Sequence, residues 1–142
     1  GSIGAGLVLA GGSRGVIDDV TGAGNHAPHG FGGGLHVSSE SEFHALRSRI
    51  EWNSAQRGGG LYAGNWCELQ VADTSVRANK AVQAGGGLFV GAVFNATLTN
   101  VSFRANDAIE GGGLGIDGAT EWIVKLANVE FTDNRARTRG AA

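Results

Sequence analysis

The chain has 142 residues, a formal net charge of −2 and 26 glycines, with one proline, one cysteine and no methionine. Glycine at about 18% exceeds the roughly 7% of an average domain, but the rarity of proline excludes collagen. A hydrophobic share of 42% with little net charge indicates a folded domain rather than a disordered chain. The balanced charge argues against a nucleic-acid partner, and the single cysteine excludes an internal disulfide.

The first residues and the apolar runs of the chain bear on its location. No run approaches the roughly 18–20 apolar residues of a membrane span, so we expect no direct membrane insertion. Gly1 and Ser2 resemble the remnant of a cleaved tag, and we expect residues 1–3 to be such a remnant or a linker. The chain is therefore expected to be a piece of a longer protein.

Taken in chain order, the sequence repeats itself about every 26 residues. Gly-Gly-Gly-Leu begins at positions 32, 58, 85 and 111, and a degenerate copy begins at position 4. In phase with it runs Asn-x-Ala, whose asparagines are Asn25, Asn53, Asn79, Asn106 and Asn134. An apolar residue precedes the last four asparagines by three positions: Ile50, Val76, Phe103 and Phe131. The first copy has Gly22 there, and atypical terminal repeats are common in stacked folds.

The segments between these motifs have the pattern of short strands. Positions 94–103 largely alternate apolar and polar residues, which is typical of a strand with one buried face. Strands, glycine corners and this period predict an all-β fold, a right-handed single-stranded parallel β-helix of the pectin-lyase-like type with about five coils. The predicted coils are residues 4–31, 32–57, 58–84, 85–110 and 111–136, followed by a tail or the start of a further coil at 137–142.

Stacking of the coils accounts for the residues that repeat. Equivalent positions of successive coils lie about 4.8 Å apart, so the leucines of the glycine motif are predicted to form one inward column. The five asparagines are predicted to form a ladder at a corner, in which each buried amide bonds to the next coil or to a turn. The glycine triplets allow positive φ and a close approach of neighbouring coils.

The pairing of Gly-Gly-Gly-Leu with Phe-x-x-Asn, as at 103–106 and 131–134, resembles the repeat of the chlamydial-type polymorphic outer membrane proteins. The resemblance covers about residues 32–136, and Ile50 and Val76 replace the phenylalanine in two copies. It implies a surface-exposed right-handed β-helix passenger of an autotransporter that acts as an adhesin.

Two carboxylates and two histidines of the first coil suggest the catalytic groups of polysaccharide hydrolases with this fold: Asp18, Asp19, His26 and His29. An inverting mechanism needs two carboxylates roughly 6.5–9.5 Å apart, whereas adjacent residues of a strand point to opposite faces. We therefore expect a non-catalytic protein, with a fragment of a polysaccharide-active enzyme as the alternative. The histidine spacing matches no metal-binding motif, so we expect no metal site and no cofactor.

Two groups of surface positions are further candidates. The outward positions His36, Tyr62 and Phe89 are expected to align as an exposed aromatic stripe. One hypothesis makes the stripe a recognition surface for a protein or sugar, and the other makes it a stacking ladder that stabilises the sheet. Asn95 and Asn100 begin N-glycosylation sequons, which only a eukaryotic secretory route would use.

These patterns together predict a structural and adhesive β-helix segment of a larger extracellular or cell-surface protein. Its lateral face is expected to contact a protein or glycan at a surface, and its partners include further β-helix coils of the same parent chain or assembly. A third hypothesis makes the chain a building block that stacks end to end into a filament, because an open β-helix exposes unpaired strands at its ends.

Overall fold

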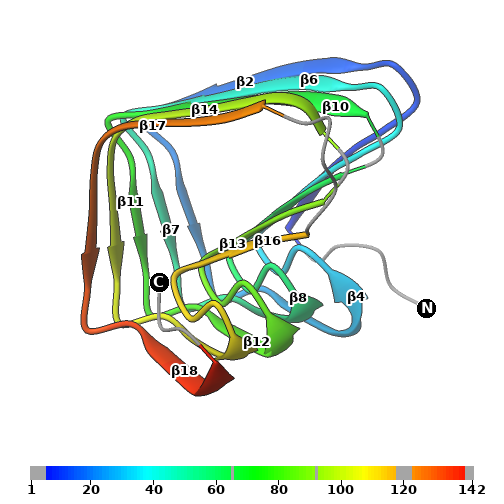
Figure 1. Ribbon diagram of the computed structural model, residues 1–142. Coiled ribbons are helices and arrows are strands. Elements are labelled where there is room, and N and C mark those ends of the chain that lie inside the picture. Colours follow the sequence, from blue (N-terminus) through cyan, green and yellow to red (C-terminus); the bar gives the residue numbers. More distant parts are fainter. Residues whose placement is uncertain (1–5, 65, 92, 118–122, 140–142) are drawn as a thin grey trace.

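The computed structural model of the chain describes residues 6–64, 66–91, 93–117 and 123–139 (Figure 1). These residues form strands and turns without a helix, so no helix among them is able to cross a membrane. The strands pair in parallel, and the chain winds through three sheets in a fixed order. The prediction of an all-β, right-handed parallel β-helix is confirmed. The remnant or linker expected at residues 1–3 lies outside the described residues.

The first and third sheets each take one strand from every coil. The strands of the first sheet are β1 (Leu7–Leu9), β5 (Leu35–Val37), β9 (Leu61–Ala63), β13 (Leu88–Val90) and β16 (Leu114–Ile116). The strands of the third sheet are β4 (His26–Phe31), β8 (Ser54–Arg57), β12 (Lys80–Ala84), β15 (Asp107–Glu110) and β18 (Arg135–Arg139). A glycine triplet joins each third-sheet strand from β4 to β15 to the first-sheet strand that follows it.

The second sheet bends around a corner of the solenoid (Figure 1). One limb contains β2 (Arg14–Asp18), β6 (Glu42–Leu46) and β10 (Cys67–Ala72), and the other contains β3 (Thr21–Ala23), β7 (Arg49–Glu51) and β11 (Ser75–Arg77). The long strands β14 (Val93–Arg104) and β17 (Ile123–Thr132) run through the corner and belong to both limbs.

The coils stack in register, with a slightly lower count than predicted. The first-sheet leucines pair in the order Leu7, Leu35, Leu61, Leu88 and Leu114. Between the first and the last of these five leucines the chain makes four turns. The solenoid therefore has about four turns rather than the five predicted coils. The last coil also continues beyond the predicted boundary at residue 136, because β18 ends at Arg139.

The hydrophobic core is a set of apolar columns inside the solenoid. The column predicted three residues before the asparagines runs in register from Gly22 to Phe131. Within it Ile50 and Phe103 are fully buried, and the rings of Phe103 and Phe131 stack with centroids 5.0 Å apart. Burial decreases at the two ends of the column because a terminal coil has a neighbour on one side only.

The asparagine ladder forms as predicted at the corner before the third sheet. Asn53, Asn79 and Asn106 are buried, and the Oδ1 of each accepts the backbone N–H and the Nδ2 of the asparagine in the preceding coil at 2.9–3.1 Å. Each Nδ2 also donates to a backbone carbonyl of the preceding coil, as from Asn79 to Ile50 at 2.8 Å. The ladder therefore joins each coil to both of its neighbours through buried amides.

Residues with a left-handed backbone conformation recur at two corners of each coil, the ladder corner and the glycine corner. The residue before each ladder asparagine has a φ between 53° and 69°: Gly24, Trp52, Ala78, Ala105 and Asp133. The first glycine of each triplet also has positive φ, as predicted, with Gly58 at 63°. The second glycine serves the other predicted role, because a Cβ at Gly59 would overlap backbone carbonyl oxygens of Lys80 and Gly86.

We predict that Asn79→Ala lowers the free energy of unfolding by about 3 kcal/mol or more, because it leaves several buried polar groups unpaired at roughly 1–3 kcal/mol each. Asn25→Ala in the half-buried first rung should cost about 1 kcal/mol. Urea unfolding followed by circular dichroism measures both. Equal losses for the two variants would contradict a ladder whose interior rungs carry the stability.

We predict that Ala105→Gly raises the free energy of unfolding by about 0.5–1 kcal/mol, because the left-handed conformation at φ 54° costs an alanine more than a glycine. The matched control is Ala108→Gly, which removes a fully buried methyl group from β15 and should destabilise the protein by about 1 kcal/mol or more. Thermal unfolding of the two variants measures both changes in stability, and a loss of stability in Ala105→Gly would contradict the prediction.

Candidate functional site

The outward aromatic residues of the first sheet form one continuous stack. The His36 and Tyr62 rings lie 4.9 Å apart with an interplanar angle of 13°, and the Tyr62 and Phe89 rings lie 5.7 Å apart at 6°. The column is set by strand register, since the three residues pair directly across β5, β9 and β13. The prediction that stacked coils align these residues is confirmed.

The prediction that this stripe is exposed is wrong. His36, Tyr62 and Phe89 are only 4%, 9% and 6% exposed. Phe31, just before the first glycine triplet, stacks on Tyr62 with ring centroids 4.9 Å apart, and the Arg57 guanidinium lies 5.4 Å from the Phe89 ring centroid. The reason is that the ends of the third-sheet strands lie against the outer face of the first sheet, which strand alternation alone does not reveal.

Burial also defines the chemistry of the stack. The His36 ring nitrogens lie 3.0 Å from the Phe31 carbonyl oxygen and 3.1 Å from the Ser38 Oγ, so both have polar partners. Burial raises the pKa of the Tyr62 hydroxyl above its usual value. These residues therefore form a covered, stacked layer, which supports the hypothesis that they stabilise the sheet.

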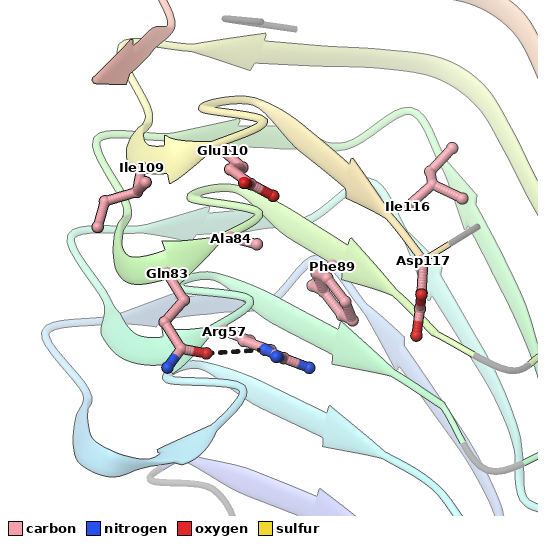
Figure 2. A pocket seen from close by; sticks show the side chains of 8 residues that line it. All are labelled: Arg57, Gln83, Ala84, Phe89, Ile109, Glu110, Ile116 and Asp117. Atoms are coloured by element: carbon pink, nitrogen blue, oxygen red, sulfur yellow. Dashed lines mark hydrogen bonds between the residues drawn. The ribbon is translucent and has the colours of Figure 1, made fainter. Parts of the chain in front are cut away.

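A groove of about 420 Å³ opens at the end of this aromatic stack, between the first and third sheets (Figure 2). Phe89 is the last ring of the stack because the next position of the column is Gly115, which has no side chain. The residues that line the groove are Arg57, Gln83, Ala84, Phe89, Ile109, Glu110, Ile116 and Asp117.

The groove combines charged, apolar and aromatic groups on rigid elements. Arg57 and Glu110 extend toward Phe89 from the ends of third-sheet strands, while Ile116 and Asp117 stand at the end of β16 (Figure 2). Arg57 Nε donates to Gln83 Oε1 at 2.9 Å, which holds the guanidinium in place. The Ile116 side chain is 51% exposed. Such a surface suits non-covalent recognition of a polar partner with an apolar portion.

One position of the repeat, which the sequence motifs do not include, indicates this groove. Phe31, Arg57, Ala84 and Glu110 each stand directly before a glycine triplet. They form one column of the third sheet, and its members differ in size and charge. A variable column beside an invariant corner motif is a candidate for recognition, because the scaffold does not dictate its residue types.

The four residues suggested for catalysis lie on different parts of the first coil. Asp18 ends β2 and forms an ion pair with Arg47, whereas His26 and His29 belong to β4 in the third sheet. His26 Nδ1 is hydrogen-bonded to the Ser54 hydroxyl. Asp19 occupies a corner with φ 56°. Asp18 in the second sheet, Asp19 at a corner and the two histidines in the third sheet therefore do not share one strand face.

The two sequon asparagines have different environments. Asn95 lies on β14, and its Oδ1 is buried without a hydrogen-bond partner. Asn100 is exposed at a corner with φ 53°, where its Nδ2 donates to Asp73 Oδ1 at 3.0 Å and its Oδ1 accepts from Asn128. Use of either asparagine for glycosylation stays a prediction.

The described residues contain no group of three or more histidine, cysteine or acidic side chains placed to hold a metal ion. Cys67 is fully buried at the start of β10. Burial raises the pKa of the Cys67 thiol to about 11, which keeps it in the unreactive thiol form at neutral pH.

Comparisons of the chain with family models, curated proteins and solved structures give no match. The resemblance to polymorphic outer membrane protein repeats therefore stays a prediction.

We predict that Tyr62→Ala lowers the free energy of unfolding by about 3 kcal/mol or more, because Tyr62 contacts three rings in the covered stack. Val82→Ala, at a residue 49% exposed on β12, should change it by less than about 0.5 kcal/mol. Chemical denaturation compares the two. A small loss for Tyr62→Ala would show that the stack adds little to stability.

Proposed function

We propose that the chain is a non-catalytic structural and adhesive segment of a larger extracellular or cell-surface β-helix protein. The observation that carries this proposal is the groove at Phe89, which presents Arg57, Ile116 and Asp117 on the side of a stacked solenoid. The function is recognition by a fixed lateral surface, with the partner a protein or a glycan.

The scaffold supports this role because both buried and surface interactions join neighbouring coils. The buried asparagine ladder joins them at one corner, and ion pairs join them on the surface. Arg14 Nε lies 2.9 Å from Glu42 Oε2, and Arg77 Nε lies 2.8 Å from Glu51 Oε2, each pair bridging adjacent coils. A surface held in this way loses little conformational entropy on binding.

The groove residues indicate which partner groups fit. The Arg57 guanidinium suits a carboxylate or sulfate of the partner, whereas Glu110 and Asp117 suit hydroxyl or ammonium groups. The exposed Ile116 side chain adds an apolar contact. Acidic glycans and mixed-charge protein surfaces both carry this combination, and both are components of cell surfaces and extracellular matrix.

We predict measurable binding of the chain to at least one of immobilised hyaluronan, heparin or fibronectin by surface plasmon resonance. Ile116→Asp should weaken that binding about tenfold, equivalent to about 1.4 kcal/mol. Val16→Asp is the matched control, since Val16 is 64% exposed on β2, outside the groove, and this variant should bind like the wild type.

Equal losses for the two variants would contradict recognition by the groove. The non-catalytic part of the proposal is tested separately with polygalacturonate as substrate. Steady release of soluble sugar products by the wild-type chain would overturn it in favour of the polysaccharide-active enzyme.

A further inference from the structure

The corner that carries the asparagine ladder also carries an exposed tryptophan. Trp52 stands where β7 turns into β8 (Figure 1), and it is 63% exposed. Within the described residues, its ring makes no ring contact and its side chain no hydrogen bond. The equivalent residues of the adjacent coils are the small Gly24 and Ala78, and a Cβ added to Gly24 would meet nothing within 4 Å. Both neighbouring coils therefore leave the indole ring uncovered.

Packing within the described residues gives no reason for a tryptophan at this position. Trp52 has a φ of 57°, a left-handed conformation that is unfavourable for a bulky side chain. The corner residues of the next two coils are Ala78 and Ala105, so a methyl group is enough to build this corner. A residue in a strained conformation whose side chain adds little to the packing is a candidate for function.

Positive charge lies beside Trp52. The Trp52 backbone N–H donates to the carbonyl oxygen of Arg77 at 3.2 Å, which places the two residues side by side on adjacent coils. Arg77 and Arg104 occupy the same outward position of β11 and β14, and Lys80 begins β12 just after the corner. Adjacent coils are about 4.8 Å apart, and like charges directly opposite each other destabilise a sheet. The two arginines therefore favour an anion that they share.

The acidic residues near these cations neutralise them only in part. The Arg77 Nε lies 2.8 Å from the Glu51 Oε2. Lys80 and Arg104 are exposed and have no ion-pair partner within the described residues. The carboxylate of Asp107, which pairs with Lys80 in the sheet register, lies 3.6 Å from the Arg137 Nε instead. Two cations beside the exposed indole thus remain available to a ligand.

We infer that Trp52, Arg77, Lys80 and Arg104 form a second lateral binding site, the Trp52 corner, which takes an acidic glycan. The indole face stacks on the C–H face of one sugar ring, and the cations bind carboxylate or sulfate groups of adjoining sugars. Trp52, Arg77 and Arg104 belong to three successive coils, so the glycan lies along the axis of the solenoid.

The combination of groups favours a glycan over other anions. An anion bound by charge alone has no use for the exposed indole of Trp52. Single-stranded nucleic acid also stacks on aromatic rings, but it is held by a positively charged groove that follows its backbone. The chain has a formal net charge of −2 and no such basic stripe in its composition.

The Trp52 corner is separate from the groove at Phe89. The groove opens between the first and third sheets, whereas the corner joins the second sheet to the third. The residues of the corner belong to the second, third and fourth coils, each of which has a described coil on both sides. Binding at this corner therefore goes beyond the proposed function, and either surface is able to bind without the other.

Isothermal titration calorimetry with a heparin hexasaccharide and with hexagalacturonate tests the Trp52 corner. We expect at least one of them to bind, more weakly as salt rises, and neutral maltohexaose not to bind. Hexagalacturonate carries carboxylates without sulfates, so the pair distinguishes the two acidic groups. Trp52→Ala should weaken binding about tenfold, and it should fold because alanine occupies this position in the next two coils. The double variant Lys80→Gln/Arg104→Gln should weaken binding at least as much and reduce its salt dependence.

Matched controls remove the same groups elsewhere. Trp66 is 43% exposed with a φ of 66° at the corner between β9 and β10, so Trp66→Ala should bind like the wild type. Lys125 is an exposed cation on β17, paired with Thr97 away from the Trp52 corner, and Lys125→Gln should also bind like the wild type. A loss in Ile116→Asp with none in Trp52→Ala would assign the glycan to the groove and overturn binding at the corner.

Four further results would each overturn the Trp52 corner as an acidic-glycan site. These are no binding of either acidic oligosaccharide, equally tight binding of maltohexaose, equal losses for Trp52→Ala and Trp66→Ala, or tighter binding of a thymidine hexanucleotide than of both glycans.

Nitrogen–proton correlation NMR of the unmodified chain covers the case in which a substitution disturbs the corner. The chain has three tryptophans, and the indole signal of Trp52 is the one missing from Trp52→Ala. This signal should shift as the bound oligosaccharide is added, while that of Trp66 should not. A Trp52 signal that stays in place at saturating oligosaccharide would contradict stacking on its ring.

Discussion

The buried asparagine ladder sets the register on which the other columns of the solenoid depend. Each interior Oδ1 receives two hydrogen bonds from the preceding coil, and each Nδ2 bonds to both neighbouring coils. A shift of one coil by a single residue would leave these amides buried and unpaired, at roughly 1–3 kcal/mol for each group. The same shift would turn the inward leucines of the first sheet outward, because side chains of a strand alternate between its two faces.

Once the register is fixed, the chemistry of the surface depends on columns whose residue types the scaffold does not determine. The residue before each glycine triplet belongs to such a column: Phe31 and Arg57 lie over first-sheet rings, and Ala84 and Glu110 line the groove. Where this residue is large it covers the aromatic stack, as Phe31 does over Tyr62. Where the first-sheet column reaches Gly115, the stack ends at Phe89 and the groove opens.

The lateral groove gives the solenoid a surface whose chemistry differs from coil to coil. The groove depends on side chains that vary from coil to coil, whereas the scaffold beneath it depends on columns that repeat. Because Asn25 and Asn134 belong to the same ladder, one kind of interaction holds all five rungs in register.

The repeat predicts the period, the parallel β-helix, the inward columns and the asparagine ladder, because steps of 26–28 residues between glycine motifs place equivalent residues over one another in successive coils. The environment of His36, Tyr62 and Phe89 was decided only by the tertiary structure. Alternation along β5, β9 and β13 places these side chains outside the core, but it does not show that Phe31 and Arg57 return to cover them. The groove likewise combines Arg57 of the second coil with Asp117 of the fifth, and only the stacking of the coils places both on one groove.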